Sequence, residues 1–381
     1  MWFFSSDQQL LQRTTRHFAT TALSPEASRC DEQESFHTQA FQHCAELGLL
    51  GLTIPIDFGG CGQGAVSTCI VMEELAAADA AFTLSYLAHT ILCTHQIAQN
   101  GSVEQKNTYL PKLLNGKTIG GLGMSEPNAG SDALSMQTRA EIQPDGSYLL
   151  YGSKMWITNA PQGDLFYCYA RTHESRHGIS SFIVEKDIQG FSRGPSIKKM
   201  GMRGSPTGSL FFDACRIPSH ARIGKEGESV PQMMKNLNLE RIALSGMSLG
   251  IARTCLHIAT KYASERHAFG RSIDQYQQIQ ERLAEGRTNF EASRCLTFQA
   301  AAKWDQGACG PLDAAMAKLH SAQMATKIAL DAIQILGGAG YSREFPIERC
   351  MRDAKLLEIG GGTNEIQRIL IAKNLSKEQA R

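Results

Sequence analysis

Residues 147–159, SYLLYGSKMWITN, form a β-like run in a chain whose flanking parts are helix-like. The run is rich in aromatic and β-branched residues, and Asp-Gly and Tyr-Gly pairs adjoin or interrupt it. Similar short runs follow, namely DLFYCYARTH, ISSFIVEKD and GSLFFDACRIP. The pattern predicts a β-rich unit over about residues 119–229.

Helical patterns occupy both sides of this unit. The segments before it include FQHCAELGLLGL and VEQKNTYLPKLLNG, and the long periodic stretches after it include PLDAAMAKLHSAQMATKIALDAIQILGG. A chain of 381 residues exceeds what one core usually organises. The sequence therefore predicts an α+β multidomain fold: an N-terminal α-helical domain (1–118), a middle β-domain (119–229) and a C-terminal α-helical bundle (230–381).

The charges are balanced, with 38 Lys and Arg against 37 Asp and Glu and a net charge of +1. No global field therefore favours a nucleic acid or an anionic membrane as partner. No apolar run reaches the ~20 residues that span a bilayer. We expect a soluble protein with no membrane span, no nucleic-acid partner and a small-molecule ligand.

Eleven cysteines occur without a CxxC pair, and the smallest spacing is eight residues, from Cys61 to Cys69. This usage favours reduced thiols and a cytoplasmic location over a disulfide framework.

The first 23 residues imitate a mitochondrial presequence, because they contain two arginines and many hydroxyls. A first structural helix is the favoured interpretation, because apolar side chains recur at roughly helical spacing. These are Phe3, Leu10, Leu11, Phe18 and Leu23.

Three short matches suggest sites that their context argues against. Residues 173–177 fit the zinc motif HExxH but lie between β-like runs, whereas the motif needs a helix. Residues 246–250 fit GxSxG inside a helical pattern, where small residues favour close helix packing over a nucleophile elbow. Residues 59–65 contain GxGxxA without a preceding strand, which favours a surface loop. We expect no metal site.

Five longer stretches carry more information: MSEPNAGSD (124–132), KMWITNA (154–160), SERHAFGRSIDQYQ (264–277), QILGGAGY (334–341) and GGGTNE (360–365). Together they resemble the acyl-CoA dehydrogenase family, and the likeness spans nearly the whole chain. The resemblance implies the same order of three domains, one FAD per subunit and an acyl thioester substrate. It also implies a homo-oligomer, usually a homotetramer, and electron-transfer flavoprotein as the electron acceptor.

The resemblance assigns one set of residues to the flavin ring and the thioester. Trp156 would pack on the isoalloxazine, and Thr158 would form a hydrogen bond near its reactive nitrogen. An aromatic face suits this place because it buries apolar area. The alternative for Trp156 is a core residue of the β-domain. The full set is Leu122, Met124, Ser125, Ser131, Trp156, Ile157 and Thr158.

A second set is assigned to the rest of the cofactor. Arg266 matches an arginine that reaches the FAD pyrophosphate across a subunit interface, which suits a guanidinium fork. Taken alone, Arg266 would be a surface ion-pair residue. The remaining members are Phe269, Gln277, Gln334, Gly337, Gly338, Thr363, Asn364 and Glu365.

Residues 358–368, EIGGGTNEIQR, lack the expected base. Many family members carry an aromatic residue and then a catalytic glutamate where this chain has Gly360 and Gly361. A base is needed because an α-proton beside a thioester is a poor acid. The isovaleryl-CoA dehydrogenase branch takes its base from another helix, in a segment resembling Asn238-Leu-Glu-Arg241. The resemblance therefore points to Glu240, which alone would be an ordinary solvated helix charge.

The resemblance further implies a substrate site formed by Ser131, Asn238, Arg241, Gly360, Gly361 and Gly362. The thioester oxygen would accept a hydrogen bond from the N–H of Gly361, and the missing side chains would let the substrate approach. The room at Gly360 favours a short, branched acyl-CoA, converted to the trans-2-enoyl thioester. This preference is weak, because one methylene discriminates by only ~1–3 kcal/mol.

Two departures from the branch keep alternatives open. Asn238 replaces the usual aspartate, and Pro231 replaces a pocket aromatic residue. Both positions concern recognition of the group that carries the acyl thioester. One alternative is a dehydrogenase or oxidase of an aminoacyl or acyl group on a phosphopantetheinyl carrier protein. Another is a non-catalytic flavin-binding scaffold, which the joint presence of Glu240, Arg266, Trp156 and Thr158 disfavours.

Overall fold

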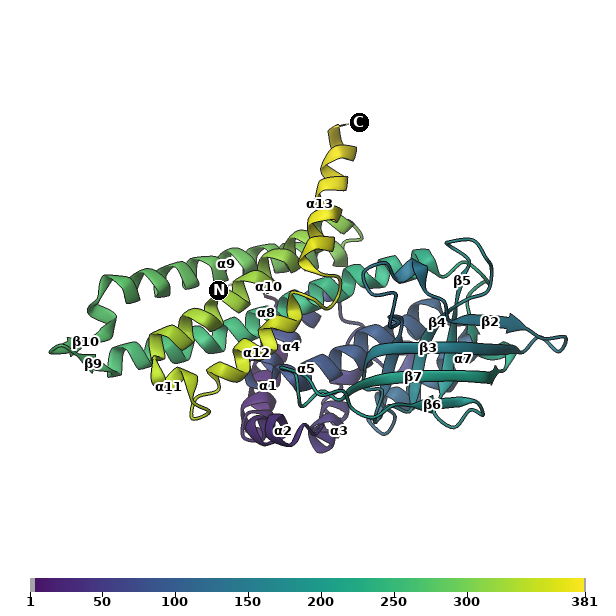
Figure 1. The fold of residues 1–381 in the computed structure, drawn as a ribbon, viewed down its shortest axis with the longest axis horizontal. Helices are drawn as coiled ribbons and strands as arrows, with labels where there is room; N and C mark the ends of the chain where they lie inside the picture. The colour runs from purple at the N-terminus through teal and green to yellow at the C-terminus, as the bar shows by residue number, and fades with distance from the viewer. Residues whose placement is uncertain (1–3, 380–381) are drawn as a thin grey trace.

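The computed structural model describes residues 4–379, in the order helices, then a sheet, then long helices. In Figure 1 the sheet lies at the right and the long helices α8 (Val230–Glu265), α9 (Gln277–Asp305) and α10 (Pro311–Leu336) extend to the left. The N-terminal helices lie beneath the long helices and beside the sheet. This order is the one that the sequence predicts.

The N-terminal part is helical. Its α-helices are α1 (Ser6–Phe18), α2 (Ala27–Gln33), α3 (Thr38–Glu46), α4 (Ala65–Ala78), α5 (Ala80–Leu87), α6 (His95–Asn100) and α7 (Val103–Leu114). Short helical turns are η1 (Ala19–Leu23), η2 (Leu49–Gly51), η3 (Ile56–Phe58) and η4 (Ala88–Thr94). The expected GxGxxA loop is confirmed, because no helix or strand covers residues 59–64.

The expected first helix is confirmed as α1. Ser5 and Gln8 form a capping box at its start, and Phe18 and Leu23 are buried. Leu10 differs from the expectation, because it is 56% exposed and faces away from the core. Phe3 lies outside the described residues.

The run of helices over residues 65–100 is interrupted at Asp79, where the backbone becomes extended with φ −150°. The Asp79 carboxylate accepts a hydrogen bond from the N–H of Phe82 at 3.0 Å and so caps the start of α5. Aspartate favours helix starts because its carboxylate satisfies a free N–H group there.

The middle part is one mixed sheet with strand order β6-β7-β3-β2-β4-β5-β8, and β1 pairs in parallel with β4. The four β-like runs of the sequence become β3, β4, β5 and β7, as predicted. Strands β1, β2, β6 and β8 were not anticipated, because they are short or rich in glycine. The bounds are β1 (Gly120–Gly123), β2 (Arg139–Ile142), β3 (Tyr148–Thr158), β4 (Leu165–Arg171), β5 (Ile179–Glu185), β6 (Phe191–Arg193), β7 (Thr207–Ile217) and β8 (Arg222–Ile223), with the turns η5 (Ala133–Ser135) and η6 (Ser219–Ala221).

The C-terminal part contains α8, α9 and α10 and their connections. A hairpin of β9 (His267–Ala268) and β10 (Arg271–Ser272), followed by the turn η7 (Ile273–Gln275), joins α8 to α9. The chain ends with α11 (Gly338–Tyr341), α12 (Ile347–Leu357) and α13 (Asn364–Gln379). Helix α13 projects away from the body in Figure 1.

Two of the short motif matches lie where the sequence context places them. His173 and His177 lie in the turn between β4 and β5. Gly246 and Gly250 lie inside α8 and face α4. A Cβ atom on Gly250 would lie 2.4 Å from the carbonyl oxygen of Glu73, so the glycine permits a close helix contact, as expected.

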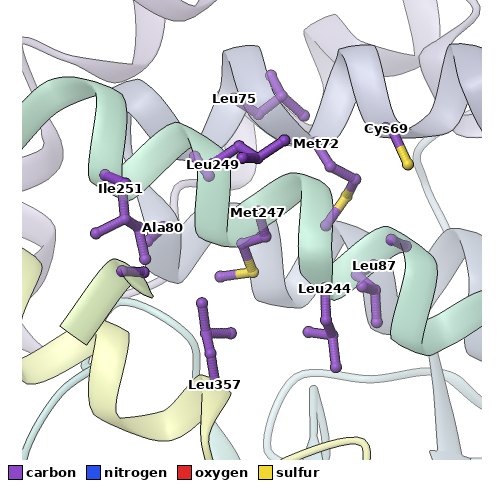
Figure 2. Close-up of a cluster of buried hydrophobic side chains, with 14 of the residues drawn as sticks. Cys69, Met72, Leu75, Ala80, Leu87, Leu244, Met247, Leu249, Ile251 and Leu357 are labelled. Atoms are coloured by element: carbon purple, nitrogen blue, oxygen red, sulfur yellow. The ribbon is translucent and has the colours of Figure 1, made fainter. Parts of the chain in front are cut away.

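Two hydrophobic clusters form the core. One joins the N-terminal helices to the long C-terminal helices, and the other joins the sheet to α6 and α7. Figure 2 shows part of the first, where Met72 and Leu75 of α4 lie beside Met247 and Leu249 of α8. All eleven cysteines are free thiols.

Helix α8 is, within residues 4–379, a helix long and apolar enough to cross a membrane by composition. Of its most apolar window, 72% is buried inside the protein. A core helix passes the same test, and the burial of α8 identifies it as one.

The close contact of α8 with α4 predicts that Gly250→Ala destabilises the protein, although alanine is normally favoured over glycine in a helix by ~1 kcal/mol. The added Cβ meets backbone that cannot rotate away, so we expect a loss of about 1–3 kcal/mol in the free energy of unfolding. Urea unfolding measures it. Gly286→Ala in α9 is the control, because its Cβ meets the end of the Leu256 side chain, which can rotate. A Gly250→Ala protein at least as stable as the wild type would contradict the prediction.

Candidate active site

Glu240 lies on α8 with its side chain turned inward toward the glycine turn that follows α12. It is 8% exposed. A Cβ atom on Gly361 would lie 3.6 Å from Oε1 of Glu240, so the carboxylate and this backbone are direct neighbours. Burial raises the pKa of Glu240 to about 7, against the opposing effect of the positive charges of Arg241 and Lys318. The site therefore holds a carboxyl group that gains and loses a proton near neutral pH.

Backbone conformation and close neighbours explain two of the three glycines. Gly361 and Gly362 have φ values of +64° and +90°, in the left-handed region that side chains disfavour. A Cβ at 361 would lie 2.5 Å from Cδ1 of Leu244, and one at 362 would lie 2.8 Å from Nε2 of Gln367. Gly360 differs, because its Cβ would meet nothing closer than 3.6 Å. Space for a larger side chain is left open at Gly360.

Three side chains from three helices hold the carbonyl groups of this turn. Arg241 of α8 donates from Nε to the oxygen of Gly361 at 3.3 Å. Gln367 of α13 donates to the oxygens of Gly361 and Gly362 at 3.2 and 2.8 Å. Lys318 of α10 donates from Nζ to the oxygen of Gly362 at 2.7 Å. The N–H groups of Gly361 and Gly362 make no hydrogen bond within the part of the chain that the structure describes.

Lys318 and Gln367 were not anticipated from the sequence. A signal was present for Lys318, because the apolar face of α10 includes Ala314 and Ala322, four residues before and after it, and all three are buried. A lysine at such a position must find a polar partner inside the protein.

The predicted substrate residues Asn238 and Arg241 lie in the same site and bind each other. Nη1 of Arg241 donates to Oδ1 of Asn238 at 2.8 Å, and both side chains are buried. Asn238 thus holds Arg241, which in turn holds the glycine turn. The predicted residues Thr363, Asn364 and Glu365 form the start of α13, where the N–H of Asn364 donates to the oxygen of Glu358 at 3.0 Å.

Trp156 lies at an irregular point of β3, where the register with β7 shifts between Lys154 and Ile157. Its φ is +64° and it is 55% exposed, which excludes the alternative of a core residue. The distortion turns a large flat ring outward, and such strain is typical of functional sites. Thr158 is half-buried at the end of the same strand. Ile157 is buried, so its side chain faces the core.

The loop with Met124 and Ser125 is fixed against β3. The N–H of Met155 donates to the oxygen of Ser125 at 2.9 Å, and Nζ of Lys154 donates to the oxygen of Met124 at 3.2 Å. Lys154 also pairs with buried Glu126 at 2.9 Å. Leu122 on β1 is half-buried, whereas Ser131 is exposed. The loop therefore lies beside Trp156 with part of its polar surface open to solvent.

The other predicted cofactor residues lie at the far end of α8. Arg266 directly follows α8, and Phe269 in the β9–β10 hairpin is 97% exposed. Glu240 is 26 residues earlier on the same helix, which at ~1.5 Å per residue places it roughly 39 Å away. One dinucleotide cannot span that distance, so Glu240 and Arg266 of one chain do not belong to the same cofactor site.

The remaining members of this set lie near the hairpin. Gln277 starts α9, Gln334 is exposed near the end of α10, and Gly337 and Gly338 form the exposed link to α11. The guanidinium of Arg266 forms no ion pair with any residue in the range 4–379. The alternative of a surface ion pair is thus not what the structure contains.

The raised pKa of Glu240 predicts a pH-dependent stability difference for Glu240→Gln. The folded protein keeps a proton on Glu240 that the unfolded chain releases above pH 4.5, so this contribution to stability is full at low pH and disappears as pH rises through about 7. The variant should match the wild type near pH 4 and exceed it above pH 7 by roughly 3 kcal/mol, at ~1.4 kcal/mol per pKa unit. Urea unfolding from pH 4 to 9 measures it, with exposed Glu344→Gln as control. A difference that does not vary with pH would refute the burial argument.

Comparisons with known proteins agree with this architecture. The family models for the acyl-CoA dehydrogenase N-terminal, middle and C-terminal domains match residues 5–117, 121–215 and 229–376. The chain is 41% identical over 380 residues to mitochondrial isovaleryl-CoA dehydrogenase of Solanum tuberosum, covering 99% of this chain and 92% of that protein.

Solved structures give the same result. Butyryl-CoA dehydrogenase from Megasphaera elsdenii has a TM-score of 0.95 at 34% identity, over 98% of this chain and 99% of that one. The prolyl acyl carrier protein oxidase AnaB has a TM-score of 0.93 at 30% identity, with the same coverage. The predicted three-domain fold is confirmed. The chain belongs to the acyl-CoA dehydrogenase family, whose members are FAD-dependent oxidoreductases that act on CH–CH bonds.

Proposed function

We propose that the protein catalyses α,β-dehydrogenation of a short, branched acyl-CoA to the trans-2-enoyl thioester, with Glu240 as the base. The observation that carries this proposal is the buried carboxyl group of Glu240 beside the backbone of Gly361. Family members commonly place a glutamate at the position of Gly361, so a carboxylate reaching this point from α8 replaces it. A base whose pKa lies near the working pH is the effective one.

The residues act on the substrate in defined ways. Glu240 takes the α-proton, the β-hydrogen leaves with its electron pair, and the two carbons form a double bond. FAD, when bound, would supply the two-electron acceptor for that hydrogen. The N–H groups of Gly361 and Gly362 have no hydrogen-bond partner within residues 4–379, and they would donate to the thioester oxygen as it gains negative charge.

The proposed acyl preference rests on Gly360 and on the relatives. A side chain at 360 would meet no atom closer than 3.6 Å, so its absence leaves volume beside the reacting carbons. The potato relative carries the name of a branched-chain substrate, isovaleryl-CoA.

The cofactor residues fit FAD. An outward-facing indole at Trp156 suits the flat apolar ring of a flavin, and an unpaired guanidinium at Arg266 suits a pyrophosphate. Because Glu240 near the start of α8 and Arg266 just after its end are too far apart to serve one FAD, we propose that neighbouring subunits of a homo-oligomer complete each site.

The family resemblance supports a homotetramer and electron-transfer flavoprotein as the acceptor. It also supports the division of the chain at 118/119 and 229/230, close to the starts of β1 and α8. A cytoplasmic location is a proposal that rests on the free thiols, whereas the potato relative is mitochondrial.

A second candidate is oxidation of an acyl or aminoacyl group on a carrier protein. Its specific support is the structural match to a prolyl acyl carrier protein oxidase. Asn238 adds to this support, because its side chain is bound to Arg241 and stands where the isovaleryl branch usually has an aspartate.

The function is tested with Glu240→Gln in an anaerobic flavin-bleaching panel of CoA-bound and carrier-bound thioesters. The wild type should bleach fastest with a short branched acyl-CoA. The variant should keep FAD and bind thioester but reduce the flavin at least ~100-fold more slowly, the low end for a general base. Glu344→Gln is the control. Normal bleaching by Glu240→Gln would remove Glu240 from the mechanism, and faster bleaching by carrier-bound groups would favour the second candidate.

Moving the base to residue 361 should partly restore activity. Glu240→Gly/Gly361→Glu should reduce flavin faster than Glu240→Gly, although the left-handed backbone costs a glutamate about 1–2 kcal/mol. Adding Leu244→Val should improve the rescue, because it removes the Cδ1 atom that a Cβ at 361 would meet at 2.5 Å.

Straight acyl chains should recover better than branched ones, because the new side chain occupies pocket volume. Anaerobic reduction rates with two thioesters of equal carbon number measure this. Glu240→Gly/Leu244→Val is the control for the added substitution. If the triple variant folds, holds FAD and binds thioester yet shows no gain with either substrate, Gly361 does not face the reacting carbon.

A further inference from the structure

Lys318 is buried without an acidic partner. It is 1% exposed, and its Nζ donates to the carbonyl oxygen of Gly362. No carboxylate lies within ion-pair distance of it in residues 4–379. The other fully buried lysine, Lys154, pairs directly with Glu126 at 2.9 Å. A buried charge without a counter-ion is costly, so packing alone does not account for Lys318.

The place of Lys318 suggests what its charge does. Of the negative charges that favour the protonated amine, that of Glu240 has the largest effect, and Lys318 in turn favours the ionised carboxylate. Its ammonium also holds the carbonyl of Gly362, in a turn where the N–H groups of Gly361 and Gly362 have no hydrogen-bond partner within residues 4–379. Each carbonyl shares its peptide plane with the N–H of the next residue, so Lys318 orients the plane that carries the N–H of Thr363, and Gln367 orients the plane that carries the N–H of Gly362.

We propose that Lys318 is a positioning residue for the dehydrogenation: with Gln367 it fixes the Gly361–Gly362 turn so that its N–H groups meet the thioester oxygen. Its positive charge favours the ionised form of Glu240 and stabilises the negative charge that develops on the substrate. This role rests on the proposed function. The hydrogen bonds from Lys318 and Gln367 to the carbonyl oxygens of Gly361 and Gly362 are called the clamp below. Gln367 is its uncharged half, because its carboxamide donates to both oxygens.

Several charged or titratable groups surround this pair. Arg241 is its neighbour on α8, Tyr169 of β4 feels the charge of Glu240, and Glu358 and Glu365 act on Lys318 from the ends of α12 and α13. Burial lowers the pKa of Lys318 to about 8, and the pKa of Glu240 is about 7. Activity needs Glu240 ionised and Lys318 protonated, so the rate should fall on both sides of a window between about pH 7 and 8.

Three variants of the FAD-bound enzyme separate the charge from the clamp. Lys318→Met removes both, Lys318→Arg keeps a charge and donors but cannot lose its proton, and Gln367→Met removes only the uncharged donor. Lys327→Met is the matched control, because Lys327 lies on the same helix, is exposed, and already has an acidic partner in Asp331. Two quantities are measured: the pH profile of flavin reduction, and the pH midpoint at which a bound β-ketoacyl-CoA becomes its enolate, read from ultraviolet absorbance.

The expected results differ for each variant. Lys318→Met should shift the acid limb of the rate profile to higher pH by about one unit or more, the usual effect of losing a nearby opposite charge. The pH midpoint of enolate formation should rise by a similar amount. Lys318→Arg should abolish the alkaline limb and leave the acid limb in place. Gln367→Met should raise the enolate midpoint without moving the acid limb, and Lys327→Met should change neither.

The outcomes separate this proposal from the proposed function. If wild-type enzyme neither bleaches with acyl thioesters nor ionises the β-ketoacyl-CoA, the proposed function itself fails. In the other case the wild-type enzyme does both. If Lys318→Met or Lys318→Arg then retains FAD and leaves both limbs of the rate profile and the enolate midpoint unchanged, Lys318 has no positioning role. Either Lys318 variant alone decides, so misfolding of one leaves the test intact.

Discussion

The close contact between α4 and α8 is the constraint on which the rest of the structure depends. Gly246 and Gly250 let the backbones of the two helices approach more closely than any side chain would permit. The contact fixes α8, and α8 in turn joins all three parts of the chain. Its first turns pack against the sheet, its middle lies in the helical core, and its end leads into the β9–β10 hairpin. A side chain on α8 is therefore held by the whole molecule.

This rigidity explains how a carboxyl group can be buried at Glu240. Burial opposes ionisation, and two cations, Arg241 and Lys318, offset part of that cost. Both cations also donate to carbonyl groups of the glycine turn. The same residues thus set the charge of the base and the shape of the backbone that faces it. A preorganised arrangement of this kind needs no rearrangement when charge develops on a substrate.

The sequence predicted the order of the three parts, the four principal strands and the position of Glu240, because each leaves a local signal. The strands are marked by β-branched and aromatic runs, and Glu240 is marked by the empty place at Gly361 in a familiar motif. The sequence did not predict Lys318 or Gln367, because a lysine in a helix is usually solvated and only packing reveals burial.

The sequence interpretation of the three glycines was incomplete. It attributed all of them to the approach of the substrate, whereas the backbone conformation and two packed neighbours already require Gly361 and Gly362. A place for Trp156 beside a flavin was expected from family resemblance alone, and the outward turn of its side chain was not predicted, because a register shift in β3 has no clear sequence signature.

The separation of Glu240 and Arg266 along one helix has a genetic consequence. If each site takes its base from one subunit and its pyrophosphate ligand from the next, a defect at either position damages a different part of the shared site. In an assembly that mixes the two defective chains, some sites combine both faults and others contain none. Two alleles that are each inactive alone would then complement one another when expressed together, although they lie in the same gene.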